Sequence, residues 1–270
     1  MPAFICSACG TQYPPSEASP GACLACTDER QFVPTSGQSW TTLEGLRKAY
    51  SNKFRRLAKG ITTIETTPAF GIGQRAIVVH TSSGNVLWDC IALIDDATVD
   101  LLNGMGGVSA IAISHPHYYT TMVEWSHALA GVPIYLHAAD REWVMRADPA
   151  VQFWEGDTKT IGSNLTLIRL GGHFDGGTVL HWSDWSEGRG VVLSGDILQV
   201  VPSGHVSFMW SYPNLIPLSA TKVERMAKIL EPFAFDAVYG AFSGRNQIDA
   251  NGKQVVAASV ARYIARINET

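Results

Sequence analysis

Hydrophobic and polar residues alternate along the chain in two blocks, and each block begins with predicted strands. In the first block, apolar or alternating runs at 61–67, 75–81 and 85–91 predict strands separated by turns that contain proline and glycine. Strands at 108–114 and 132–137 then alternate with predicted helices, which are 97–105, 120–131 and 138–148. A basic amphipathic segment in front, 42–59, also predicts a helix.

The second block repeats this order with different residues. Its predicted strands are 164–172, 176–182, 188–196 and 235–242, and its predicted helices are 219–233 and 252–267. Each block thus has strands first and then strands alternating with helices. This order predicts an α/β (α+β) protein in which two mixed sheets pack together with helices on the outside.

Composition narrows the classes of partner. The chain has 270 residues, of which 46% are hydrophobic, and its net charge is -4. This balance argues against a nucleic-acid binder or a polybasic membrane-surface protein. No apolar run reaches the roughly 18 residues of a membrane span, and the first residues lack the regions of a signal peptide. We expect a cytoplasmic protein that acts on a small molecule, and the sequence leaves a homo-oligomer open.

Four of the five cysteines form two pairs near the N-terminus, Cys6-x2-Cys9 and Cys23-x2-Cys26. Each pair presents two thiolates from a tight turn, and two such turns close a tetrahedral four-sulfur site. The spacing predicts a zinc-ribbon or rubredoxin-like metal module at 1–34, joined by a linker rich in proline, glycine and serine to a main domain at 35–270. Structural zinc is favoured, and iron is the alternative that would imply electron transfer.

In the main domain, metal-competent side chains follow four predicted strands. These side chains are Asp89, His115 with His117, His173 and Asp196. Because strand ends on one edge of a sheet converge, residues far apart in sequence can build one site there. A proline between His115 and His117 favours an extended backbone, from which both imidazoles can face one ion.

In this order the residues resemble the metallo-β-lactamase superfamily of metal hydrolases, over roughly residues 60–245. The resemblance implies an αββα sandwich with the metal site along one edge of the paired sheets. It implies that His115, His117 and His173 hold the first metal. It also implies that Asp196 bridges two metals or binds the second, and that Asp89 supports the ligand loop.

The chain departs from the family pattern at the second metal. The family motif is H-x-H-x-D-H, but here Tyr119 replaces the aspartate and Thr120 replaces the last histidine. Ser243 stands where the family's final histidine is expected. The second site is therefore read as degenerate, and a mononuclear main site follows, with zinc favoured over iron.

A metal-dependent hydrolase is the leading hypothesis for function, acting on an ester, thioester, lactone or related small-molecule bond. Asp196 would orient or deprotonate water, and Tyr119 or Tyr118 would donate a hydrogen bond to the developing oxyanion. Aromatic and turn residues in the later loops make His205, Trp210 and Tyr212 candidates for the pocket wall, together with Ser243.

Two other hypotheses belong to different classes. The first is a dioxygenase of the same fold, in which His115, His173 and Asp196 hold mononuclear iron and the cysteine module acts as a redox partner. The second is a catalytically degenerate binding protein, motivated by the loss of the second metal's ligands.

Overall fold

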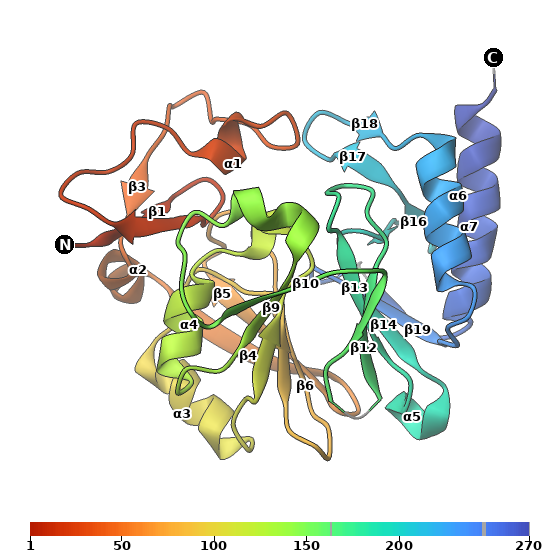
Figure 1. Ribbon diagram of the computed structural model, residues 1–270, viewed down its shortest axis with the longest axis horizontal. Helices are drawn as coiled ribbons and strands as arrows, with labels where there is room; N and C mark the ends of the chain where they lie inside the picture. The colour runs from red at the N-terminus through yellow and green to blue at the C-terminus, as the bar shows by residue number, and fades with distance from the viewer. Residues whose placement is uncertain (163, 245–246, 270) are drawn as a thin grey trace.

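One sheet of seven strands carries the first half of the main domain (Figure 1). Its strand order is β10-β9-β8-β7-β6-β5-β4; the pairs from β4 to β7 are antiparallel, and those from β7 to β10 are parallel. The computed structural model describes residues 1–162, 164–244 and 247–269. The strands are β4 (Ser51–Ala58), β5 (Ile61–Thr67), β6 (Ala76–Val79), β7 (Val86–Trp88), β8 (Ala110–Ala112), β9 (Ile134–His137) and β10 (Val151–Trp154).

A second sheet of six strands carries the other half, in the order β11-β12-β13-β14-β19-β20. Only the β14 and β19 pair is parallel among the described strands of this sheet. Its strands are β11 (Thr158–Thr160), β12 (Leu165–Arg169), β13 (Thr178–Trp182), β14 (Val191–Gly195), β19 (Ala237–Gly240) and β20 (Gln247–Ile248).

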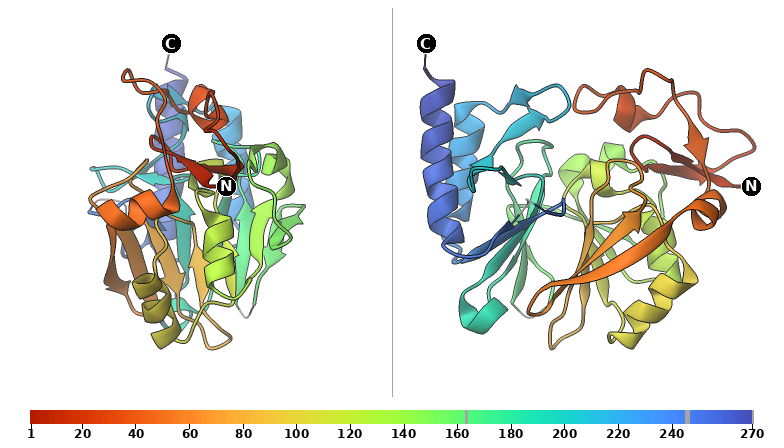
Figure 2. Two further views of the ribbon diagram at one scale, coloured as in Figure 1. Left: turned by 90° about the vertical axis from the view of Figure 1, so that its left-hand side faces the viewer. Right: turned by 180° about the vertical axis from the view of Figure 1, so that it is seen from behind.

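The two sheets pack face to face, and helices cover both outer faces (Figures 1 and 2). Helices α3 (Asp96–Gly104) and α4 (Met122–Ala128) lie on the first sheet, whereas α6 (Ala220–Leu230) and α7 (Gly252–Ile267) lie on the second. Residues of both sheets, such as Trp88 and Leu193, share the apolar layer between them. The predicted αββα sandwich is confirmed.

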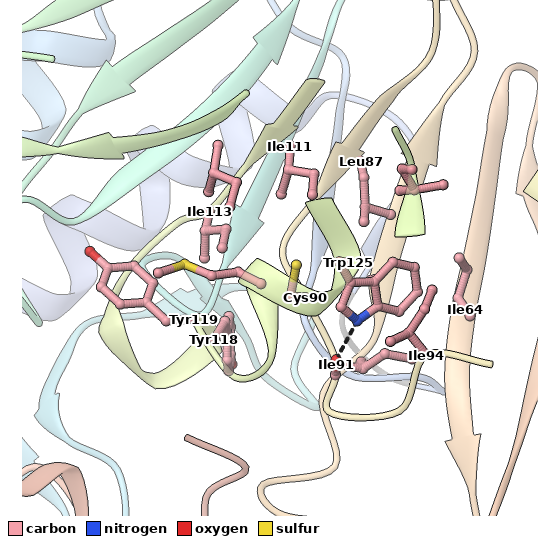
Figure 3. Packing of buried hydrophobic residues seen from close by; sticks show 14 of the residues in the cluster. Ile64, Leu87, Cys90, Ile91, Ile94, Ile111, Ile113, Tyr118, Tyr119 and Trp125 are labelled. Carbon is pink, nitrogen blue, oxygen red and sulfur yellow. Dashed lines mark hydrogen bonds between the residues drawn. The ribbon is translucent and has the colours of Figure 1, made fainter. Parts of the chain in front are cut away.

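Strand β6 shows how the sequence fits this layering. Ile77 and Val79 face the second sheet, whereas Ala76 and Val78 face the layer under the helices. Side chains of a strand alternate between its faces, so a strand that is apolar throughout suits a sheet covered on both sides. In the helix-side layer, the indole nitrogen of Trp125 donates to the carbonyl of Ile91 at 2.8 Å (Figure 3).

The predicted helix at 42–59 is wrong over its second half. The helix α2 (Leu43–Ala49) begins at a Thr42 cap, and the chain then runs as strand β4. A turn through Gly60, whose φ is +72°, pairs β4 with β5. The basic residues of β4, Lys53, Arg55 and Arg56, are exposed on this edge strand, and exposed charges on an edge oppose pairing with other chains. The pairing of β4 with β5 thus determines the structure of this part, although its apolar residues have helical spacing.

The predicted helix at 138–148 is also wrong. The segment forms short 3₁₀ turns, η2 (Ala138–Trp143), with Asp140 at φ −109° and ψ 18° inside it. The Asp140 carboxylate accepts a hydrogen bond from Gly176 N at 2.7 Å, which draws this segment to the loop between β12 and β13.

Several short elements lie outside the predicted pattern, because two-residue and three-residue strands give no periodic signal. Besides β10, β11 and β20, they are η1 (Pro116–Tyr118), α5 (Trp185–Gly188), β15 (Gln199–Val200), β16 (Val206–Ser207), β17 (Met209–Ser211) and β18 (Ile216–Pro217).

The cysteine-rich segment folds into a small sheet of its own, ordered β2-β1-β3, at one end of the sandwich (Figure 1). Its elements are β1 (Ala3–Cys6), β2 (Gln12–Pro15), α1 (Leu24–Thr27) and β3 (Trp40–Thr41). Because β3 pairs with β1, this sheet takes in residues beyond the segment 1–34 that carries the cysteines. None of the helices described here is long and apolar enough to span a membrane.

Candidate functional site

The metal-competent side chains meet at one edge of the sandwich. Asp89 follows β7, His115 and His117 follow β8, and Asp196 follows β14. His173 lies in the loop between β12 and β13. The backbone is extended at His115 but turns into η1 directly afterwards, so only the first half of the predicted extended loop is present.

The three imidazoles form one cluster. The ring centroids of His115, His117 and His173 lie 5.0–5.2 Å apart. His173 Nε2 and His117 Nδ1 are separated by 3.1 Å, and one ring nitrogen from each histidine lies within 4.8 Å of the others. All three side chains are buried.

Neighbouring groups orient two of these rings. His173 Nδ1 lies 2.6 Å from the carbonyl oxygen of Trp210. A carbonyl can only accept, so Nδ1 carries the hydrogen and Nε2 presents a free lone pair. His115 Nδ1 is 2.9 Å from Ser114 Oγ, which leaves His115 Nε2 facing the cluster.

Burial keeps the imidazoles neutral. Desolvation lowers the pKa of His173 to about 4, and it lowers the pKa of His115 and of His117 well below the usual value. Neutral imidazole is the form that binds a metal, so the cluster is prepared for one at neutral pH.

Asp196 lies beside the cluster in contact with Tyr118. Its Oδ1 is 3.3 Å from His115 Nε2, and its Oδ2 accepts a hydrogen bond from the Tyr118 hydroxyl at 3.0 Å. Burial raises the pKa of Asp196 to about 7. Both tyrosine rings belong to the apolar layer next to α4, but they diverge from adjacent positions (Figure 3), and the hydrogen bond to Asp196 is made by Tyr118. Of the two tyrosines considered from sequence, Tyr118 therefore contacts Asp196.

Asp89 lies behind the ligand loop. Its Oδ1 accepts a hydrogen bond from the backbone N–H of Ser114 at 2.7 Å, and Ser114 in turn contacts His115. Asp89 has a positive φ of 59°, which turns the chain sharply after β7. Burial raises the pKa of this carboxyl to about 7. Asp89 thus supports His115 through one intervening residue.

The donor set fits a metal ion. Nitrogen ligands about 2.0–2.1 Å from a tetrahedral zinc are about 3.3 Å from each other. The separations of 3.1 Å between His173 and His117 and of 3.3 Å between His115 and Asp196 are close to that distance between two ligands. His115 Nε2, His117 Nε2 and Asp196 Oδ1 are buried without a hydrogen-bond partner among the described residues. Buried polar atoms without partners are costly, and a cation would satisfy those that face the cluster.

The cluster opens into a cavity of about 650 Å³. Its wall is mostly apolar, with Phe32, Val201 and Phe242 among the lining residues, and Tyr212 lines it as predicted. Some of the wall comes from the cysteine module, which the sequence pattern did not indicate; these residues are Ala8, Arg30, Gln31 and Phe32.

The other predicted wall residues lie elsewhere. His205 Nδ1 contacts the carbonyl of Ser203 in an outer loop, and the Ser243 hydroxyl donates to the Glu65 carboxylate. Trp210 contributes its carbonyl to His173 rather than lining the cavity. An aromatic loop made His205 and Trp210 candidates, and the family pattern made Ser243 one, but the direction of each side chain depends on tertiary packing.

The four cysteines form the second cluster. Cys6 Sγ and Cys26 Sγ are 3.6 Å apart, as are Cys9 Sγ and Cys23 Sγ, and all four sulfurs lie within 4.8 Å of one another. Zn–S bonds of about 2.3 Å place tetrahedral sulfurs about 3.8 Å apart, whereas a disulfide would need about 2.05 Å. Hydrogen bonds among the four thiols lower the pKa of Cys6 and Cys23 and raise the pKa of Cys9 and Cys26, so the four groups share their protons. This donor set also fits a metal ion.

Asp140 holds the loop that carries His173. Its carboxylate accepts from Gly176 N, and a Cβ at Gly176 would approach Asp140 Oδ2 to 2.6 Å, so glycine is required there. Burial raises the pKa of Asp140 to about 7.

The pKa of Asp140 predicts a pH dependence of folding. The carboxyl binds its proton more tightly in the folded chain, so its contribution to stability is complete below pH 3.8 and is lost as pH rises through about 7. From pH 4 to pH 8 the free energy of unfolding should fall less in an Asp140→Asn variant than in the unmodified protein. The difference between the two falls should be at most about 4 kcal/mol. Urea unfolding at both pH values measures this difference, and identical pH profiles would contradict it.

Comparison with known proteins assigns the chain to a family. No protein-family model matches it. Over 271 aligned residues it is 46% identical to the uncharacterized protein YmaE of Bacillus subtilis (strain 168), with 99% of this chain and 98% of YmaE covered. The chain belongs to the same family as YmaE.

Solved structures with a similar backbone are metallo-β-lactamases. DIM-1 exposed to ceftazidime superposes with a TM-score of 0.59 at 13% identity, covering 81% of this chain and 98% of DIM-1. FIM-1 from Pseudomonas aeruginosa, in its mono-zinc form, gives 0.56 at 13% identity, covering 78% and 95%. A B3 metallo-β-lactamase with an active-site glutamic acid gives 0.53 at 12% identity, covering 85% and 97%. The chain therefore has the metallo-β-lactamase fold.

Within this fold, the second metal site is degenerate. Among the described residues, the only groups of three or more histidine, cysteine or acidic side chains placed to hold an ion are the three histidines and the four cysteines. Tyr119 packs in the core, Thr120 has a buried hydroxyl without a partner, and Ser243 contacts Glu65.

Proposed function

We propose that this member of the YmaE family is a metal-dependent hydrolase that uses a mononuclear site. The observation that carries the proposal is the convergence of three neutral imidazoles beside Asp196, with unpartnered buried nitrogen and oxygen atoms at the floor of a cavity. His115, His117 and His173 would hold the ion, most readily zinc, whose ligand preference they match.

The protein's own groups complete the chemistry. When bound, zinc lowers the pKa of a water ligand to about 7 and polarises a carbonyl oxygen. Asp196 is placed to accept the proton from attacking water, because its Oδ1 lies 3.3 Å from His115 Nε2 and has no hydrogen-bond partner among the described residues. A nearby cation favours the ionised carboxylate and thereby keeps it able to accept.

Tyr118 has the second role. Its hydroxyl donates to Asp196, and burial raises its pKa well above the usual value, so the phenol stays protonated. The phenol has one hydrogen, which holds the carboxylate in place here, so Tyr118 would have to turn away from Asp196 to donate a hydrogen bond to charge that develops on the substrate oxygen.

The cavity favours a small, largely apolar substrate. Apolar side chains such as Ile72, Val200 and Pro202 form most of its wall, and Arg30 is the one Lys or Arg among the described lining residues. Arg30 is already paired with Asp28. A polyphosphate or nucleotide would find no cluster of cations there, so we propose an ester, thioester or lactone with an apolar acyl group.

The arrangement supports hydrolysis over oxygen chemistry. The dioxygenase hypothesis uses His115, His173 and Asp196, but here the three imidazoles form the closest set and His117 belongs to it. FIM-1 has a mono-zinc form, which supports the proposal that a site of this fold can hold a single ion.

The test is hydrolysis by protein reconstituted with zinc, assayed against small esters, thioesters and lactones with acyl chains of increasing length. We expect turnover that is lost on chelation and restored by zinc. Iron in the main site with oxygen consumption on a thiol substrate would contradict hydrolysis, and a main site that takes up no metal would instead favour a binding protein.

A further inference from the structure

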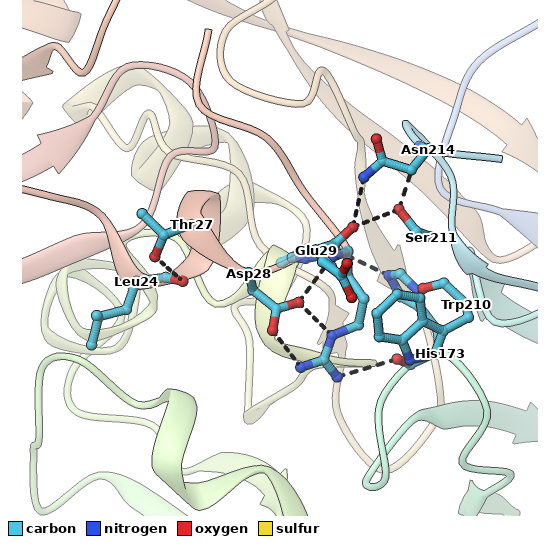
Figure 4. Close-up of polar contacts among 10 residues, drawn as sticks. Leu24, Thr27, Asp28, Glu29, His173, Trp210, Ser211 and Asn214 are labelled. Atoms are coloured by element: carbon cyan, nitrogen blue, oxygen red, sulfur yellow. Dashed lines mark hydrogen bonds and ion pairs between the residues drawn. The ribbon is translucent and has the colours of Figure 1, made fainter. Parts of the chain in front are cut away.

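The segment that follows α1 joins the cysteine module to the loops around His173 (Figure 4). Cys26 lies at the end of α1, and its backbone N–H donates to the carbonyl of Cys23. Asp28 follows two residues later. The position of this segment is therefore fixed by the turn that presents two of the four thiolates.

Arg30 makes the contact with the histidine loop. Asp28 holds its guanidinium through two hydrogen bonds, Nε to Oδ1 at 2.6 Å and Nη2 to Oδ2 at 3.0 Å. Held in this way, the guanidinium stacks 3.9 Å above the ring of Phe174, and Nη1 lies 3.4 Å from the carbonyl oxygen of His173. The Arg30 side chain is 15% exposed, so these contacts are shielded from solvent.

The backbone of Glu29 holds the second loop. Its carbonyl accepts from Ser211 Oγ at 2.8 Å and from Asn214 Nδ2 at 2.7 Å, which uses both of its lone pairs. Ser211 follows Trp210, whose carbonyl accepts from His173 Nδ1. The loop of Trp210 thus orients the ring of His173, whereas the backbone of His173 lies in the loop between β12 and β13. The segment Asp28–Arg30 of the module contacts both loops.

We propose that Asp28, Glu29 and Arg30 form a clamp that positions His173, so that the ion at the four cysteines governs how tightly the three histidines bind their own ion. The clamp rests on the proposed function, because it requires metal at the histidines. Arg30 is a positioning residue, since it acts through the backbone of His173 and through Phe174. The cysteine module is then part of the hydrolytic centre and not an independent appendage.

The interface between module and main domain supplies a matched control. Arg146 also bridges the two parts, through Gln12 Oε1 at 2.6 Å and through the Glu124 carboxylate of α4. Its side chain is 17% exposed, close to the 15% of Arg30, but neither of its two partners belongs to the His173 loop. Removing Arg146 tests the effect of a weakened interface alone.

The test measures cobalt(II) binding at the histidines, in protein whose cysteine site is first loaded with zinc, by absorption and competition with a chelator. Arg30→Gln should raise the dissociation constant of cobalt about tenfold or more, as supporting partners of metal ligands typically do, and should change the absorption of the bound ion. Arg146→Gln should change the constant by less than about threefold. Asn214→Ala should follow Arg30→Gln in direction, because it releases Glu29.

The outcomes separate the two proposals. If the unmodified protein takes up no cobalt at the histidines, the proposed function fails. If it binds cobalt and Arg30→Gln binds equally well, or if Arg146→Gln weakens binding as much as Arg30→Gln, the clamp fails alone. A folded Cys26→Ser variant should weaken cobalt binding at least as much as Arg30→Gln does, and unmodified affinity there would overturn the coupling between the two sites.

Discussion

Tyr118→Phe should lower kcat for hydrolysis by about 100-fold, while the metal stays bound. The substitution removes one hydroxyl, which donates to Asp196 Oδ2 at 3.0 Å. Without it the buried carboxylate loses the hydroxyl that holds it, and no phenol hydrogen is left that could turn toward the substrate oxygen. Neither loss touches the three imidazoles, so the metal content should not change. Steady-state kinetics and metal analysis of the purified variant measure the two effects separately.

The neighbouring tyrosine is the control for this prediction. Tyr119→Phe removes the same atom from the next residue, but that ring packs in the apolar layer next to α4, and the hydroxyl that donates to Asp196 belongs to Tyr118. We expect kcat within about twofold of the unmodified protein, because no contact to the reacting groups is lost. Equal losses in both variants would show that the tyrosines act through stability, and an active Tyr118→Phe variant would remove Tyr118 from the mechanism.

Much of the sandwich could be predicted because its strands are buried on both faces. The runs at 75–81 and 108–114 each contain four consecutive apolar residues, 76–79 and 110–113, and short apolar runs bounded by turns indicate interior strands. The helix predicted at 42–59 is wrong over its second half because the local pattern does not determine that part of the structure. Its spacing suits a helix, but pairing with β5 across the turn at Gly60 determines its second half. That pairing is tertiary, and local periodicity does not contain it.

The candidate site shows the same limit. The two cysteine pairs and the histidine pair were found because their ligand spacing is local in sequence. Which of Tyr118 and Tyr119 contacts Asp196 depends on the 3₁₀ turn η1, which the sequence did not indicate.

The contacts of residues 28–32 are not predicted, because the stretch 29–40, with its proline, glycine and serines, is interpreted as a linker. Arg30 and Phe32 line the cavity because the whole module packs against the His173 loop. A cation beside an acidic residue in a polar segment is common on protein surfaces, so no local signal could have found it.

His115→Ala should abolish metal binding at the main site and hydrolysis with it. His115 presents Nε2 to the cluster, and losing a direct ligand should weaken binding by more than the roughly 10-fold to 100-fold seen for supporting residues. The cysteine site should keep its ion, because its four sulfurs form a separate cluster. The variant therefore carries its own internal reference for metal loading.

The most direct test is to count and locate the ions by anomalous X-ray scattering at the zinc and iron edges, in crystals of the unmodified protein and of His115→Ala. A mononuclear hydrolase predicts two zinc ions in each unmodified chain, one among the four cysteines and one among the three histidines, and only the cysteine ion in the variant. A third ion beside Asp196, or an ion that remains at the histidines of His115→Ala, would contradict the account.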